Sequence, residues 1–343
     1  MTGISPLISI ITPSYNRADE LKYLYKSLKN QTIDKRVFEF IVSDDGSTDN
    51  TEQIVKKWQL KSEFKIKFIK QKNQGPGSAR NHGLQNAQGE IILFIDSDCE
   101  AHPDWIKTIH NAFQDDKIDA FGGPDAAKED FEPLQKAIDF SMTSFFTTGG
   151  MRGHSDKMMA KFFPRTHNMG IRKHIYNKIG GFGELRHGQD IEFSNRMRKT
   201  GANIKFLIEA IVYHRRRSTL KQFFKQVFNW GVARINLGKI DKEMLEFIHF
   251  LPSIAIIIFS IISIVVLSIG IPIIYFILAT LIPLICLAIF GTIKKKDIRI
   301  FHLLIIVIPA QIFGYGLGFI FNFVNRYIFN RDSWTGFIKK YYD

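Results

Sequence analysis

Short apolar runs alternate with amphipathic stretches through the first part of the chain. The runs at 7–11, 38–42, 65–69 and 91–95 are rich in β-branched and aromatic residues and are bounded by polar turns, which predicts buried strands. Helices are predicted between them, at about 18–31, 51–60 and 75–86. This alternation of strands and helices predicts an α/β domain with a mostly parallel, Rossmann-like sheet.

A different pattern begins near residue 250, where charged residues nearly vanish. Three apolar stretches, at roughly 249–270, 271–291 and 300–324, each approach the ~20 residues with which a helix crosses a bilayer. The turn at 270–272 is so short that the first two stretches should form a hairpin. Lysines at 294–296 place the return of this hairpin on the cytoplasmic side. We expect the amino-terminal domain to be cytoplasmic as well, because no signal peptide precedes its first strand.

The pattern divides the chain into four parts. They are a cytoplasmic α/β domain at 1–217, amphipathic interfacial helices at 218–248, about three transmembrane helices at 249–325, and a basic tail at 326–343. Aromatic and basic side chains interleave at helical spacing in the second part, which suits a helix in the bilayer interface, although core packing explains the aromatic residues equally well.

The third apolar stretch leaves its topology open. Its glycines at 314, 316 and 318 form a small-residue face that can pack closely against neighbouring helices. If the stretch crosses fully, the tail with Arg331, Lys339 and Lys340 ends outside, against the rule that positive charge stays inside.

Composition adds charge to this picture. The 343 residues carry a formal net charge of +13, concentrated between about 152 and 242 and again at 294–296. Beside membrane spans such charge more often meets anionic lipid headgroups than nucleic acid, for which the chain has no motif. The two cysteines, Cys99 and Cys286, lie in separate regions and provide neither a disulfide framework nor a zinc site. Membrane lipids are therefore expected partners, and nucleic acid is not.

The strand at 91–95 is followed by two carboxylates, Asp96 and Asp98. Carboxyl ends of strands form the ligand crevice of open α/β sheets, and alternation along an extended chain points both side chains to one side. Two carboxylates can hold Mg²⁺ or Mn²⁺ and leave positions open for phosphate oxygens. A solvated acidic turn is the simpler interpretation of an isolated Asp-x-Asp, so the neighbouring motifs decide.

Three motifs precede this turn. They are Thr-Pro-Ser-Tyr-Asn at 12–16, Asp-Asp-Gly-Ser-Thr-Asp at 44–49 and Gly-x-x-x-Ala-Arg-Asn-x-Gly at 75–83. Followed by Asp-x-Asp, this order resembles the family-2 glycosyltransferases with the GT-A fold, over roughly residues 7–235. No Gly-x-Gly-x-x-Gly follows the first strand, which argues against a nicotinamide enzyme.

The resemblance implies roles for the donor side of the site. Tyr15, Asp44 and Asp45 would line the pocket for the nucleobase and ribose, where a ring can stack and carboxylates can accept hydrogen bonds. The resemblance places the metal ion on Asp98. The other nucleotide-sugar contacts would be Pro13, Asn16, Arg17, Gly77, Arg80 and Asp96. Helix capping is the alternative for the carboxylates at 44–49, above all for Asp49.

Two later stretches extend the resemblance. Gly188-Gln189-Asp190 resembles the segment in which the aspartate of a Glu-Asp pair is the catalytic base, with helix capping as the alternative. Gln189 replaces the glutamate, which removes a negative charge that could raise the pKa of Asp190. His214 resembles a third metal ligand of some GT-A enzymes, and a purely structural histidine is the alternative.

The stretch at 226–230 implies an acceptor site at Gln226 and Trp230. It resembles the Gln-x-x-Arg-Trp motif of processive synthases, but Asn229 stands in place of the arginine. Those synthases also carry spans before the catalytic domain, and this sequence shows none there. Processive polymerisation is therefore not expected. The His-x-Arg-Arg stretch with trailing spans is more similar to bacterial succinoglycan-type enzymes.

The resemblance therefore implies an inverting, metal-dependent glycosyltransferase with several spans in the cell (inner) membrane. It would use Mg²⁺ or Mn²⁺ and a nucleotide-sugar donor, with a UDP-sugar favoured, and its acceptor would be a polyprenyl-linked saccharide. Two alternatives stay open. One is an enzyme that glycosylates a polyprenyl phosphate, whose ionised oxygen needs no base, and the other is a non-catalytic membrane scaffold. The scaffold would be marked by loss of Asp98 or Asp190, and both are present.

Overall fold

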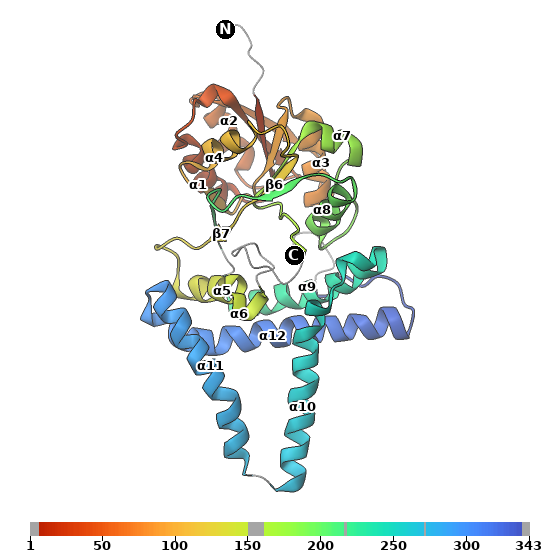
Figure 1. The fold of residues 1–343 in the computed structure, drawn as a ribbon. Helices are drawn as coiled ribbons and strands as arrows, with labels where there is room; N and C mark the ends of the chain where they lie inside the picture. The colour runs from red at the N-terminus through yellow and green to blue at the C-terminus, as the bar shows by residue number, and fades with distance from the viewer. Residues whose placement is uncertain (1–6, 150–160, 216–217, 271, 338–343) are drawn as a thin grey trace. The chain divides into compact units, whose positions relative to one another are not determined.

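The computed structural model describes residues 7–149, 161–215, 218–270 and 272–337 (Figure 1). They fall into two compact units. Residues up to 126, together with 162–215, form an α/β unit, and residues 127–161 and 216–339 belong to a helical unit. The helical unit thus includes a segment around 127–149 that the sequence pattern left in the amino-terminal domain. The expected boundary at 217, Ile271 in the expected turn, and Lys339 and Lys340 lie outside the described residues.

The α/β unit is built on a seven-stranded sheet in the order β3-β2-β1-β4-β8-β6-β9. Its parallel half consists of β1 (Ile8–Ser14), β2 (Phe38–Asp44), β3 (Lys65–Lys70) and β4 (Ile91–Phe94). β8 (Met169–Arg172) is antiparallel to β4 and to β6 (Ala120–Gly122), and β9 (Ile204–Phe206) is parallel to β6. The mostly parallel sheet is confirmed, and its four parallel strands lie close to their predicted positions.

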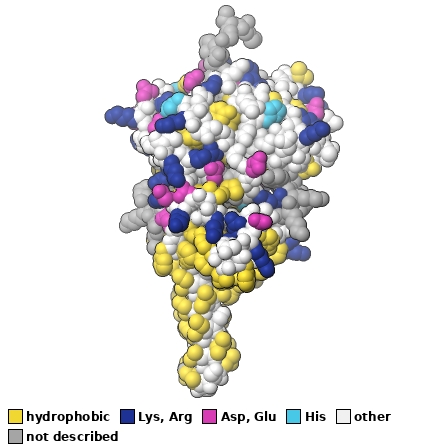
Figure 2. Space-filling view, turned by 90° about the vertical axis from the view of Figure 1, so that its right-hand side faces the viewer, with side chains coloured by type: hydrophobic (Ala, Val, Ile, Leu, Met, Phe, Trp, Pro, Cys, Tyr) yellow, Lys and Arg dark blue, Asp and Glu magenta, His cyan; other side chains and the backbone are white. Residues whose placement is uncertain are grey.

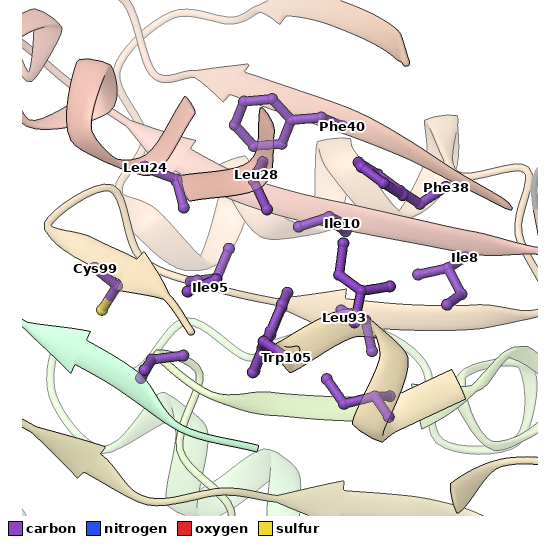
Figure 3. Packing of buried hydrophobic residues seen from close by; sticks show 14 of the residues in the cluster. Ile8, Ile10, Leu24, Leu28, Phe38, Phe40, Leu93, Ile95, Cys99 and Trp105 are labelled. Atoms are coloured by element: carbon purple, nitrogen blue, oxygen red, sulfur yellow. The ribbon is translucent and has the colours of Figure 1, made fainter. Parts of the chain in front are cut away.

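Helices cover both faces of this sheet. One face carries α1 (Ala18–Lys29), α2 (Thr51–Gln59) and α4 (Trp105–Ala112), and the other carries α3 (Pro76–Asn86), α7 (Lys173–Ile179) and α8 (Gln189–Lys199). In β4, Leu93 belongs to the first core cluster, whereas Ile92 and Phe94 belong to the second. Figure 3 shows the first cluster, in which Leu93 packs near Trp105 of α4. The apolar run of β4 is continuous because both of its faces are buried.

A second, three-stranded sheet was not predicted from the sequence pattern. It has the order β5-β10-β7 and consists of β5 (Cys99–Ala101), β10 (Val212–His214) and β7 (Asp125–Ala126). β10 is antiparallel to β5, with His214 opposite Cys99, and parallel to β7, with Val212 opposite Asp125. The pairing brings together side chains that lie far apart in the sequence.

The helical unit contains the expected carboxyl-terminal helices together with two short helices, α5 (Pro133–Thr143) and α6 (Phe145–Thr148), that the sequence pattern did not predict. The expected helices are α9 (Leu220–Ile240), α10 (Leu251–Ile269), α11 (Ile273–Lys295) and α12 (Phe301–Phe323). Glycines let α12 approach its neighbours, as the small-residue face predicted. A Cβ on Gly318 would lie 2.1 Å from the carbonyl oxygen of Phe228 in α9, and one on Gly316 would lie 2.5 Å from Ile256 in α10. The close approach of α12 to α9 therefore requires glycine at Gly318, whereas at Gly316 the closest atom is the movable end of the Ile256 side chain.

Three helical segments are long and apolar enough to cross a membrane, with mean hydropathies of 2.8, 2.8 and 2.1 in chain order. Figure 1 shows α10 and α11 extending together away from α12, and Figure 2 shows hydrophobic side chains gathered over this hairpin. The third segment differs, since 39% of its most apolar stretch is buried, against 11% and 6% in the first two. Part of the α12 surface packs on Phe223 and Val227 of α9. The topology of α12, left open by the sequence, is not decided by these observations.

Candidate active site

The two carboxylates in the acidic turn after β4 have different partners. β4 ends at Phe94, so Asp96 and Asp98 lie in a turn, and the alternation of an extended chain does not orient them. Asp96 Oδ1 accepts a hydrogen bond from Arg80 Nη2 at 2.7 Å, whereas Asp98 Oδ1 lies 3.3 Å from His214 Nε2. The argument from strand alternation is thus wrong, because both residues lie beyond the end of β4. A buried arginine engages Asp96, and the nucleotide-sugar contact expected of Asp96 stays a prediction.

Asp98, Cys99 and His214 could together hold a metal ion, since one ligand atom of each lies within 4.8 Å of the others. The side chains of Asp98 and His214 are 19% and 18% exposed, so an ion can reach them. Cys99 is fully buried, and Figure 3 places it among the hydrophobic residues of the first cluster. Mg²⁺ and Mn²⁺ both prefer oxygen ligands to a thiol, and Mn²⁺ accepts an imidazole nitrogen more readily than Mg²⁺ does. Asp98 and His214 fit such an ion and leave its other positions to phosphate oxygens and water.

Arg17 is electrostatically coupled to the same turn. Burial by itself lowers the pKa of its guanidinium, but the carboxylates of Asp98, Glu20 and Asp96 raise it by more. Arg17 Nη1 also pairs with Glu20 Oε1 at 2.7 Å. A permanent positive charge thus faces the acidic turn, where it can compensate the charge of a bound diphosphate.

The neighbouring carboxylates of Asp44 and Asp45 are used differently. Asp45 Oδ1 accepts hydrogen bonds from Gln71 Nε2 and the Gln74 amide, at 2.7 and 2.9 Å, and Oδ2 accepts one from the Gly75 amide at 2.7 Å. In Asp44 only Oδ2 is bonded, by the Ser47 amide at 3.0 Å, and within the described residues Oδ1 is buried with no hydrogen-bond partner. Asp45 therefore organises the glycine-rich turn, whereas the nucleotide contact expected of Asp44 stays a prediction.

The first two motifs are tied to each other by hydrogen bonds. Asn16 adopts a φ of 51°, with its amide donating to Ser47 Oγ and its Oδ1 accepting from the Thr48 amide, both at 2.8 Å. Asp49 Oδ2 accepts a hydrogen bond from the Ala18 amide in the first turn of α1. Capping, the alternative considered for Asp49, therefore describes its contacts. Pro13 lies in β1 and Tyr15, half-buried, directly follows it.

Asp190 lies in the first turn of α8, and its carboxylate is held among positive charges. Arg165 Nη1 lies 3.5 Å from Asp190 Oδ2. Burial raises the pKa of Asp190, but the charges of Arg165, His167 and Arg80 outweigh it and hold the pKa below the ordinary value. The carboxylate is therefore ionised at neutral pH and can accept a hydrogen bond or a proton.

Gln189, the departure from the Glu-Asp pair, faces the amino terminus of α3. A Cβ on Gly77 would lie 2.4 Å from Gln189 Nε2, so glycine leaves room for the present position of this side chain. Gly77 therefore contributes space for α8 to pack against α3, beside the donor contact that the sequence predicts for it.

Sequence reasoning missed three residues around the site: Asp125, Arg165 and His167. Arg165 and His167 precede β8 in an irregular segment, and Asp125 forms part of a two-residue strand. None of the three belongs to a motif. Arg165 and His167 are found through their effect on Asp190, and Asp125 is found through the pairing of its strand with β10. Gln226 and Trp230 lie on α9 in the helical unit, and Trp230 packs against its core. Their acceptor role stays a prediction.

A sequence comparison decides the family. The profile described as Glycosyl transferase family 2 matches residues 9–228. This chain is a family 2 glycosyltransferase. Similar proteins include Glycosyltransferase AglE of Haloferax volcanii, 25% identical over 247 residues, which are 72% of this chain and 79% of AglE. Another is the GalNAc(5)-diNAcBac-PP-undecaprenol beta-1,3-glucosyltransferase of Campylobacter jejuni, 36% identical over 119 residues, or 34% of this chain and 38% of that protein.

Solved structures confirm the GT-A fold of this glycosyltransferase. The mannosyltransferase PcManGT of Pyrobaculum calidifontis, solved with GDP-Man and Mn²⁺, has a TM-score of 0.67 at 15% identity and covers 93% of this chain and 88% of its own. Residues 1–349 of TarS from S. aureus, solved with UDP-GlcNAc, have a TM-score of 0.50 at 20% identity, over 97% of this chain and 94% of theirs. At these identities the likeness concerns the fold alone.

Proposed function

We propose that this glycosyltransferase transfers a sugar from a nucleotide sugar to a hydroxyl of a polyprenyl-linked saccharide and inverts the anomeric centre. One observation carries the proposal: Arg80 links the acidic turn to the candidate base. Its guanidinium donates to Asp96 at 2.7 Å, and its charge also lowers the pKa of Asp190. The ionised Asp190 thus belongs to the same charged network as the turn assigned to the donor.

The side chains have complementary roles in such a transfer. Asp98 and His214 would hold Mg²⁺ or Mn²⁺, which neutralises charge on the departing diphosphate. Arg17 contributes further positive charge at the same turn, and Asp44 Oδ1 accepts a hydrogen bond from the base or ribose. Asp190 takes the proton of the acceptor hydroxyl as its oxygen attacks the sugar opposite the leaving group. A single displacement of this kind inverts the configuration.

A lipid-linked acceptor is supported by relatives and by the helical unit. The Campylobacter relative is named for an undecaprenol-linked substrate, and three segments of this chain are apolar enough to span a bilayer. Lys294 and Lys295 end α11, and positive charge at the end of a span favours the cytoplasmic side. We therefore assign the enzyme to the cell membrane, with its α/β unit in the cytoplasm where it meets the donor.

A polyprenyl phosphate is the second candidate acceptor, and one observation favours it. The lowered pKa of Asp190 makes this carboxylate a weaker base, which matters only when a proton must be removed. A phosphate oxygen is already ionised at neutral pH and attacks without help. The two candidates therefore differ in their need for Asp190.

Replacement of Asp190 by asparagine tests the choice. With a saccharide acceptor, Asp190→Asn should lower turnover at saturating donor by ~10²–10⁴-fold, because an amide cannot take the proton. Binding of the nucleoside diphosphate should stay unchanged. Asp116→Asn, at a fully exposed carboxylate, is the matched control. Near-normal turnover of the Asp190 variant on a polyprenyl phosphate, with none on saccharide acceptors for the wild type, would move the assignment to the second candidate.

A further inference from the structure

A buried carboxylate lies on the far side of His214 from the acidic turn. Asp125 Oδ2 is 3.6 Å from His214 Nδ1, while Asp98 Oδ1 is 3.3 Å from Nε2. The imidazole thus stands between two carboxylates, of which Asp98 is 19% exposed and Asp125 only 1%. An ion can reach the Asp98 side of the ring, whereas the Asp125 side is closed to solvent.

We propose that Asp125 is a positioning residue, which orients His214 and fixes its tautomer for binding a divalent cation together with Asp98. This inference rests on the metal role of Asp98 and His214 in the proposed function. A neutral imidazole has one N–H and one lone pair. The negative charge of Asp125 beside Nδ1 favours the tautomer that carries its N–H there, and the lone pair of Nε2 then points to the Asp98 side. A carboxylate behind a histidine ligand also increases the basicity of the imidazole toward the ion.

The backbone around Asp125 is built to hold this geometry. Asn168 Nδ2 donates to the carbonyl oxygens of Pro124 and Ala210, at 2.9 and 2.6 Å. A Cβ on Gly123 would lie 2.3 Å from the Ala210 oxygen, so the segment before β7 packs directly on the one before β10. These contacts fix the strand of Asp125 against the strand of His214, which is the support that a precise ligand geometry requires.

His167 is the other histidine near Asp125. Its Nε2 lies 3.8 Å from Asp125 Oδ2, and its ring centroid lies 5.2 Å from that of His214. His167 also contributes to the lowered pKa of Asp190. If Asp125 acted through His167, its removal would affect the base rather than metal affinity. A test must therefore ask through which imidazole Asp125 acts.

Mn²⁺ affinity of the full-length protein in detergent, measured by electron paramagnetic resonance without donor or acceptor, gives that test. Asp125→Asn should weaken Mn²⁺ binding by ~10–100-fold. Asp125→Glu keeps the charge but moves the oxygens, and it should fall between the wild type and Asp125→Asn. In a His214→Ala background, Asp125→Asn should cause no further loss, whereas in a His167→Ala background its full effect should remain.

Asp119→Asn is the matched control, because Asp119 Oδ1 faces His174 Nε2 at 3.2 Å on the same unit, outside the candidate site. It should bind Mn²⁺ like the wild type. Circular dichroism and thermal unfolding report whether each variant folds. If Asp125→Asn does not fold, Asp125→Glu is compared with the wild type instead.

Two results would overturn the inference. One is wild-type Mn²⁺ affinity in the folded Asp125 variants, and the other is an equal loss with and without His214. The proposed metal site fails separately, if Asp98→Ala and His214→Ala themselves bind Mn²⁺ like the wild type. Weak binding by these two variants with normal binding by Asp125→Asn would remove only the role of Asp125.

Discussion

The donor side and the metal side of the α/β unit are assembled in different ways. On the donor side, contiguous motifs follow the parallel strands β1 and β2 and are joined by hydrogen bonds such as those that Asn16 and Asp45 accept from backbone amides. On the metal side, three strands of two or three residues, from around 100, 125 and 213, pair into a separate sheet. Regular βαβ topology predicts the first arrangement from sequence, whereas the second exists only through tertiary pairing.

The two sides also differ in what their carboxylates do. On the donor side Asp45 is saturated by backbone and side-chain donors, so it holds structure. On the metal side Asp98 faces an imidazole and is partly exposed, so it is placed for a ligand. Side chains of the same type should therefore respond differently to substitution.

The largest effect is expected on the metal side. Asp98→Ala should lower turnover by at least ~10²–10³-fold, because it removes the carboxylate proposed to hold the metal ion. Without that ion, the negative charge on the departing diphosphate is no longer neutralised. Turnover is measured with added Mg²⁺ or Mn²⁺ and again in chelator. Asp116→Ala, at an exposed surface carboxylate, should behave as the wild type. Full activity of the Asp98 variant, or of the wild type in chelator, would refute the metal assignment.

A smaller effect separates Asp44 from Asp45. Asp45→Asn presents an amide to groups that donate hydrogen bonds, so it should lower the free energy of unfolding by about 1–3 kcal/mol. Asp44→Asn keeps the bond from the Ser47 amide and should leave stability nearly unchanged, but weaken nucleoside-diphosphate binding about tenfold. Chemical denaturation and calorimetric titration measure the two effects. Each variant is the control of the other, and the reversed pattern would show that Asp45 is the ligand.

The smallest expected effect concerns pH. The pKa of Asp190 is lowered, so the carboxylate stays ionised when the pH falls through the ordinary aspartate pKa of about 4. The stability that the ionised carboxylate contributes is lost only when the pH falls through the lowered pKa. Arg165→Met removes a positive charge and should move the acid limb of turnover to higher pH. Arg198→Met, at an exposed position on α8, should not move it. An unchanged limb in the Arg165 variant would show that Asp190 is not the group that titrates.

The sequence predicted the parallel sheet, its helices and most donor-side positions because hydrophobic runs and turn motifs are local. It predicted that alternation along a strand points Asp96 and Asp98 to one side, but β4 ends before both residues, and Asp96 pairs with Arg80. Asp125 carried no signal, since a single aspartate in a short strand acquires meaning only from its neighbours in β10.

The helical unit teaches the same lesson. Helix α5 joins this unit through apolar core packing and through two charged pairs, Lys136 with Asp297 at 3.1 Å and Lys295 with Asp139 at 2.6 Å. In each pair about 160 residues separate the partners along the chain, 161 and 156 respectively. Hydropathy predicted the hairpin of α10 and α11 because their exposed surface is uniformly apolar. Hydropathy alone gave no sign that 39% of the most apolar stretch of the third segment, which contains α12, would be buried.

The central claim is that the sugar is transferred in one displacement. An acceptor oxygen assisted by Asp190 attacks the sugar while the diphosphate, bound at Asp98, departs. The anomeric configuration of the first product tests this claim most directly. Nuclear magnetic resonance of the product, recorded early in the reaction of the full-length enzyme, gives the configuration of the new linkage. The account predicts a configuration opposite to that of the donor. A product with the configuration of the donor would require two displacements or attack from the leaving-group side, and it would contradict the account.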